Sequence, residues 1–157
     1  MITNRGNTPV KVRGRILKMN SKNYELEAKR KENENYLKLF ENQMKKEGLA
    51  PRIIKKHLSN VEFYINDYLL FSSIINIEDG MSEMRDFFYY WFFAKALHSK
   101  CESVSAHIDS VTLFYKLMVD QGLANREDYE KMLCNINEYK AEWIKKWSKN
   151  NNLGGDL

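Results

Sequence analysis

The sequence contains few residues that break helices and few that cross-link a chain. Of its 157 residues, seven are glycine, two are proline and two are cysteine. So few breakers over this length argue against many short strands joined by tight turns and favour helices. The two cysteines, Cys101 and Cys134, are too few for a disulfide framework. Because the N-terminus also lacks the pattern of a secretory leader, we expect a cytoplasmic protein.

Long hydrophobic runs are also lacking. The most strongly apolar run, residues 87–94, is far shorter than the roughly 20 residues that a membrane-spanning helix needs. We therefore expect no contact with a membrane. The apolar residues that are present, 43% of the chain, suffice for one ordinary hydrophobic core in a single domain.

Positive charge is concentrated at the N-terminus. The chain has a net charge of +4, but residues 1–22 contain six basic residues and no acid, so residues 23–157 carry −2. Residues 1–22 lack apolar periodicity and contain Gly6, Pro9 and Gly14, which predicts a disordered basic arm. Such an arm can follow phosphates or another anionic surface. The residues that would make this contact are Arg5, Lys11, Arg13, Arg15 and Lys18.

Five segments have the apolar periodicity of helices. We expect these helices at residues 23–46, 51–71, 82–97, 101–121 and 125–149. The predicted fold is therefore all-α, a single bundle of about five helices spanning residues 23–149. Residues 72–81 are expected to form a loop, and residues 150–157 a disordered tail.

Local signals mark the ends of several helices. Gly48 and Gly122 each follow an apolar-periodic segment and predict its C-terminal end. Pro51 suits the first turn of the next helix. Ser82 and Asn125 are expected to be N-caps, because their short polar side chains can accept a hydrogen bond from a free backbone N–H.

Seven consecutive aromatic residues occupy positions 87–93. On a helix they point in every direction, so one apolar face cannot account for them. Either this helix is central and covered on all sides, or some rings are exposed and form a surface for a partner. The residues that would form this partner surface are Phe63, Tyr89, Tyr90, Trp143 and Trp147.

The order of turns and apolar positions resembles the N-terminal, SAM-like core-binding domain of tyrosine recombinases, the phage integrases. The residues that carry this resemblance are Tyr36-Leu37-x-x-Phe40, Gly48-Leu49-Ala50-Pro51, and Ser103-Val104-x-x-His107-Ile108-x-x-Val111-x-x-Phe114-Tyr115-x-x-Met118 before Gly122-Leu123. The resemblance covers most of residues 33–135. It implies a SAM-like bundle that binds DNA, without the catalytic domain that follows in this family.

Residues for DNA cleavage are lacking. A tyrosine recombinase needs an arginine-rich anion site, a His-x-x-Arg pair and a tyrosine nucleophile. None of His57, His98 and His107 is followed by arginine at the third position, and Arg126 is the only arginine beyond Arg85. We therefore expect no enzymatic activity and no cofactor. The run His98, Cys101 and His107 lacks the fourth ligand that a structural zinc site needs unless Cys134 supplies it, and no metal is expected.

The resemblance places the helix at residues 51–71 against DNA. With Ile54 and Leu58 facing inward, polar residues gather on the opposite face of this helix. The N-terminus of the helix at residues 101–121 can also hold a phosphate, although Ser103 there equally suits an ordinary cap. The residues predicted to contact DNA are Lys45, Lys46, Arg52, Lys55, Lys56, Ser59, Lys100 and Ser103.

Two functions fit the sequence. The first is non-catalytic binding of double-stranded DNA, as by an accessory factor of a bacterial mobile element or a truncated product of an integrase gene. The second is a helical protein–protein adaptor that binds a separate partner, or a second copy of itself, through the aromatic surface and does not bind DNA. They differ in salt-dependent affinity for nucleic acid, which phosphate neutralisation produces.

Overall fold

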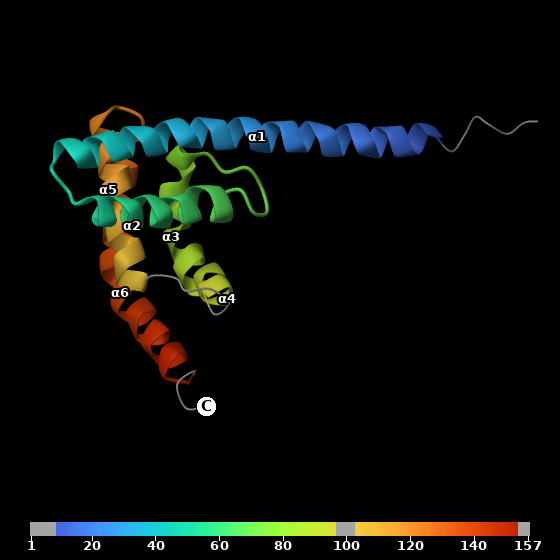
Figure 1. The fold of residues 1–157 in the computed structure, drawn as a ribbon. Helices are drawn as coiled ribbons and strands as arrows, with labels where there is room; N and C mark the ends of the chain where they lie inside the picture. The colour runs from blue at the N-terminus through green and yellow to red at the C-terminus, as the bar shows by residue number, and fades with distance from the viewer. Residues whose placement is uncertain (1–8, 97–102, 154–157) are drawn as a thin grey trace, which may run out of the picture.

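The computed structural model describes residues 9–96 and 103–153, which form helices joined by turns and contain no strand (Figure 1). The elements are α1 (Pro9–Lys46), α2 (Pro51–Glu62), the π-helix η1 (Phe63–Tyr68), the 3₁₀ helix η2 (Ile77–Glu83), α3 (Met84–Asp86), the π-helix η3 (Phe87–Trp91), α4 (Phe92–Ala96), α5 (Val104–Asp120) and α6 (Arg126–Leu153). Because α2–η1 and η2–α4 are each continuous, the described chain forms five helical segments. The predicted all-α bundle of about five helices is confirmed.

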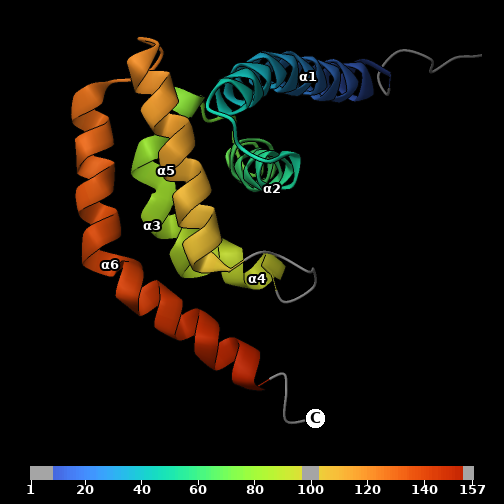
Figure 2. The same ribbon diagram turned by 60° about the vertical axis from the view of Figure 1, so that its left-hand side comes forward.

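The helices pack as two antiparallel pairs with the η2–α4 segment against both (Figures 1 and 2). α2 packs on α1 and α5, and α5 packs on α6. The η2–α4 segment contacts α6, and its aromatic rings reach η1. The N-terminal half of α1 extends beyond the bundle in both views, and Tyr24 there is 74% exposed.

Both chain ends of the described structure are more helical than expected. α1 begins at Pro9 rather than near residue 23, so the expectation of a disordered arm is wrong for residues 9–22. Proline suits the first helical position, and each residue added to an existing helix contributes one hydrogen bond, which favours extension. For the same reason α6 continues to Leu153, into the expected tail. Residues 1–8 and 154–157 lie outside the described residues.

The expected loop at residues 72–81 is partly wrong, because η2 begins at Ile77. Ile77 and Met81 are buried, so the chain already packs on the core before Ser82. Ser82 is therefore not an N-cap: its hydroxyl donates to the carbonyl oxygen of Asp79 at 3.0 Å. The predicted cap at Asn125 is confirmed, since its Oδ1 accepts from the backbone N–H of Asp128 at 3.1 Å.

Gly48 and Gly122 end α1 and α5, as predicted. Their φ angles are 79° and 73°, in the left-handed region. The N–H of Leu49 donates to the carbonyl of Met44 at 3.1 Å, and at the end of α5 the N–H of Leu123 donates to the carbonyl of Met118 at 2.8 Å. These bonds satisfy carbonyls that would otherwise lack partners at the helix ends, in the Schellman arrangement.

We expect Gly48→Ala to lower the free energy of unfolding by about 1 kcal/mol, because an L-residue is strained in the left-handed region. A Cβ at this position would meet no atom within 4 Å, so conformational strain is the only cost. Urea denaturation measures the change, with Lys46→Ala at an exposed helical position as the control. A loss above about 3 kcal/mol would contradict the open space seen around Gly48.

The aromatic run at residues 87–93 lies mainly in the core. Phe87, Phe88 and Phe92 have no exposed surface, and Phe93 is 6% exposed. Phe88 stacks on the Trp143 ring with centroids 5.0 Å apart. These four rings therefore agree with the interpretation of the run as a central helix that is covered on all sides.

The predicted partner surface is mostly covered. Trp143 is 1% exposed, so its assignment to an exposed surface is wrong. Phe63, Tyr89 and Trp147 are half-buried against the core, and only Tyr90 is largely exposed, at 68%. The Phe63 ring lies 5.0 Å from Trp91 and 6.1 Å from Phe87, because η3 covers the end of the polar side of α2. Such tertiary covering is not visible in the pattern of a single helix.

Candidate nucleic-acid interface

One face of α2 is exposed and basic. Arg52, Lys55, Lys56 and Ser59 are exposed, whereas Ile54 on the opposite side is 5% exposed. Pro51 at the first helical position starts α2, and the helical repeat then places the basic residues together. Within residues 9–96 and 103–153, Arg52 and Lys55 form no ion pair, so their charge remains available to a ligand.

The last turn of α1 extends this surface. Lys45 and Lys46 are exposed there, directly before the Gly48 turn. Lys45 and Lys55 line one hollow of about 450 Å³, so the two helices present their charges side by side. Lys45 is also 2.9 Å from Glu41, an exposed pair that contributes little and can open at low cost. The α2 basic face is defined here as Lys45, Lys46, Arg52, Lys55, Lys56 and Ser59.

Of the other predicted contact residues, only Ser103 has a described side chain. Lys100 lies outside the described residues. The Ser103 hydroxyl accepts from the N–H of Ala106 at 3.2 Å and caps α5, which is the ordinary role also considered for it. Of the predicted arm, Arg5 lies outside the described residues. The other four residues belong to the helical backbone of α1: Lys11, Arg13, Arg15 and Lys18.

A buried polar cluster fixes the rotation of α2 against α5. The Ser110 hydroxyl, 1% exposed, accepts from the side-chain amide of Asn60 at 3.0 Å and donates to the carbonyl of Ala106 at 3.0 Å. His57 Nδ1 lies 2.8 Å from the same oxygen. The tautomer of His57 with a proton on Nδ1 is the one that allows all three hydrogen bonds of the Ser110 hydroxyl at once. Burial lowers the pKa of His57. These bonds hold the α2 basic face outward.

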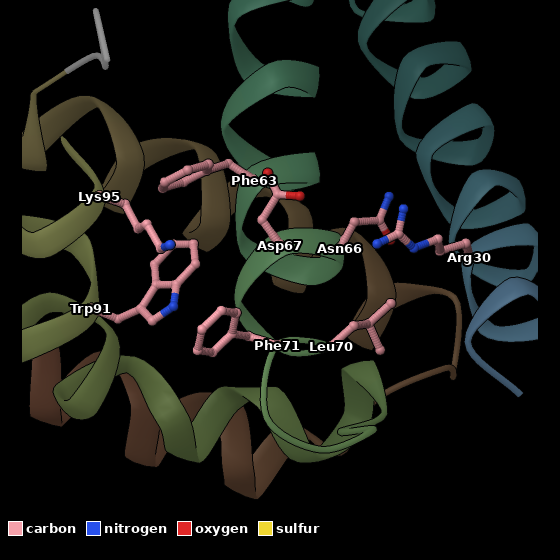
Figure 3. A pocket seen from close by; sticks show the side chains of 8 residues that line it. All are labelled: Arg30, Phe63, Asn66, Asp67, Leu70, Phe71, Trp91 and Lys95. Carbon is pink, nitrogen blue, oxygen red and sulfur yellow. The ribbon is translucent and has the colours of Figure 1, made fainter. Parts of the chain in front are cut away.

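A second hollow, of about 430 Å³, lies at the C-terminal end of the α2–η1 segment (Figure 3). Arg30 of α1 stands on one side, and Trp91 of η3 and Lys95 of α4 stand on the other. Between them lie residues of η1 and of the turn that follows it. We call this hollow the η1 pocket, lined by Arg30, Phe63, Asn66, Asp67, Leu70, Phe71, Trp91 and Lys95.

Aromatic rings and charges meet in the η1 pocket. The Lys95 ammonium lies 5.1 Å from the centre of the Phe71 ring and 5.9 Å from that of Trp91. Burial raises the pKa of Asp67, and the positive charge of Arg30 opposes this shift. Sequence patterns missed the pocket because three elements distant in the chain build it. In the sequence Phe71 only closes the amphipathic segment at residues 51–71, and its exposure is visible in the structure alone.

A metal site is not assembled within the described residues, where no three His, Cys, Asp or Glu side chains are grouped to hold an ion. Two members of the His98, Cys101 and His107 run lie outside those residues. His107 is 2% exposed and packs between the rings of Phe63 and Phe92, with centroids 5.5 and 4.9 Å away. Neither ring nitrogen has a hydrogen-bond partner among the described residues, and burial lowers the pKa of His107 to about 4.

None of the helices in the described ranges combines the length and the apolar character needed to cross a membrane. Comparisons with models of protein families, with curated proteins and with solved structures each found no match. A functional assignment therefore depends on the residues of this chain and the surfaces that they form.

Proposed function

We propose that the protein is a non-catalytic, cytoplasmic binder of double-stranded DNA that uses the α2 basic face. The observation that carries this proposal is the gathering of exposed basic side chains on one face of α2, with Lys45 from the last turn of α1 lining the same hollow as Lys55. The resemblance to the core-binding domain of tyrosine recombinases also supports it, because the matching helix lies against DNA in that family.

The dimensions of α2 suit this role. Its 12 residues span about 18 Å, and a helix fits the major groove of B-DNA, which is about 12 Å wide. Arg52, Lys55 and Lys56 are then placed to neutralise phosphates, which supplies affinity without reading sequence. Ser59, in the middle of the same face, can reach a phosphate or a base edge.

DNA bound in this way would remain intact. The chain has no His-x-x-Arg pair and no arginine cluster in its second half to hold a scissile phosphate. The Ser110 hydroxyl beside His57 does not replace them, since Ser110 is buried and its proton is donated to Ala106. We infer a role as an accessory DNA-binding factor, acting beside a separate catalytic protein.

The double variant Arg52→Gln/Lys55→Gln is expected to weaken DNA binding. Loss of two phosphate contacts should reduce the slope of log affinity against log salt concentration by about 2. Fluorescence anisotropy with a labelled 30-base-pair duplex measures both quantities. The control is Lys140→Gln/Lys145→Gln, which removes the same net charge from exposed positions of α6. Equal losses in both double variants would show a response to net charge alone and would refute the α2 assignment.

An adaptor function without DNA binding is favoured by one observation, the 68% exposure of Tyr90 beside the half-buried Tyr89. Under this alternative, Tyr90→Ala abolishes binding to a protein partner or to a second copy of the chain. The Arg52→Gln/Lys55→Gln variant would leave such binding unchanged. Sedimentation velocity on the purified chain and on Tyr90→Ala tests the self-association form of this alternative.

A further inference from the structure

We propose that the η1 pocket holds one unpaired nucleotide at the end of a DNA duplex that lies along the α2 basic face. The preferred DNA is therefore a duplex with a single-stranded overhang. This inference rests on the proposed DNA binding and deepens it, because it names the form of DNA that the protein prefers.

The position of the η1 pocket supports this proposal. η1 continues α2 without a break, so the pocket is reached along the same helical segment as the α2 basic face. Lys56, Ser59 and Phe63 follow one another at helical spacing on one side of this segment. Phe63 lines the pocket about 10 Å beyond Lys56, at 1.5 Å per residue. A strand held by the basic face thus needs only a few nucleotides to reach the pocket.

The walls of the pocket suit a planar base. Phe71 is 63% exposed although it is a large aromatic residue, and its ring faces the pocket beside Trp91 (Figure 3). Bases stack readily on exposed aromatic rings. At about 430 Å³ the hollow lies within the size range of pockets that hold small organic ligands, and one nucleotide is such a ligand.

The polar groups of the pocket match the rest of a nucleotide. Arg30 and Lys95 stand on opposite walls, where either cation can contact the phosphate. Asn66 accepts from Asn33 through its Oδ1 at 2.8 Å, so its amide nitrogen is left to donate. Asp67 adds an acceptor next to it. One donor and one acceptor together complement a base edge with an amino group, as in adenine, cytosine and guanine.

The test compares a blunt 20-base-pair duplex with the same duplex carrying three unpaired dA nucleotides at the 5′ or the 3′ end. We expect about tenfold tighter binding of one overhang duplex, the gain typical of stacking one base on an aromatic ring. Phe71→Ala should remove this preference and leave the affinity for the blunt duplex unchanged. Tyr90→Ala is the matched control, because it removes another exposed ring outside the pocket and should preserve the preference.

Failure of this inference differs from failure of the proposed function. If the blunt and both overhang duplexes bind equally well, the pocket proposal is overturned and DNA binding stands. If no duplex binds, the proposed function fails. Free dAMP is then titrated into the labelled protein, and NMR shows whether the pocket binds a nucleotide. Shifts near Phe71 and Trp91 that Phe71→Ala abolishes would support a pocket for a free mononucleotide. The absence of shifts would overturn the pocket as well.

Discussion

Replacing Gly80 with alanine is expected to lower the free energy of unfolding by about 3 kcal/mol or more. Gly80 lies buried in η2 under two tyrosine hydroxyls. A Cβ at this position would lie 2.7 Å from Leu69 Cδ1 and closer still to Tyr115 Oη. The Tyr115 ring cannot retreat without breaking its 2.7 Å hydrogen bond to the carbonyl of Ile77. Overpacking and the loss of a buried hydrogen bond therefore both lower the free energy of unfolding of this variant.

The hydroxyl of Tyr64 is a second reason why η2 tolerates little movement at Gly80. Tyr64 Oη donates to the carbonyl of Gly80 itself, so movement of the Gly80 backbone would disturb a second buried bond. Tyr64 and Tyr115 have no exposed surface, and burial raises the pKa of both, which keeps them protonated donors. The η2 turn in turn leads into the aromatic run that forms the centre of the core.

Urea denaturation of Gly80→Ala, Tyr115→Phe and the double variant tests this explanation. Removing the Tyr115 hydroxyl relieves the closest contact, so the double variant should cost less than the sum of the two single variants. Gly48→Ala is the control for glycine replacement in open space. If Gly80→Ala costs no more than Gly48→Ala, the close packing described around Gly80 is wrong.

The second large effect is loss of stability in acid through His107. Its pKa is about 4 in the folded protein and near 6.5 when unfolded, because the charged ring would be buried between Phe63 and Phe92. Between these pH values the unfolded chain binds a proton that the folded chain does not. The free energy of unfolding therefore falls as pH drops from about 6.5 to 4, by about 3 kcal/mol from this residue.

His107→Leu isolates this contribution. Within the described part of the chain both ring nitrogens lack hydrogen-bond partners, so leucine loses no bond there and should leave stability at pH 7 unchanged or raised. Urea denaturation of both proteins at pH 7 and pH 4.5 should show a much smaller acid loss in the variant. An identical acid loss in both proteins would mean that other groups, such as carboxylates, cause it.

Local signals in the sequence predicted the features that depend on a few neighbouring residues. Gly48 and Gly122 end their helices in the structure because only a residue without Cβ adopts a positive φ at low cost. Asn125 caps α6 through a bond to an N–H three residues later. The expected inward position of Ile54 is correct, and the exposed position of the basic residues on the opposite side of α2 followed from it.

Features that depend on tertiary packing were not visible in the sequence. Trp143 is buried because it stacks on Phe88, a residue more than fifty positions earlier in the chain. Phe63 lies on the polar side of α2 but is covered by η3. The η1 pocket needs Arg30 of α1 and Lys95 of α4, two residues far apart in the sequence. Helical periodicity describes one segment at a time and carries no information on which segment covers another.

The most direct test of the central proposal is the affinity of the full chain for a 30-base-pair duplex at 50 mM and 200 mM salt. If the α2 basic face binds phosphates, we expect micromolar binding at the lower concentration that weakens by at least tenfold at the higher one. The same salt dependence should persist when residues 1–22 are removed, since the face lies outside them. No binding at 50 mM salt, or binding that disappears with residues 1–22, would contradict the proposal.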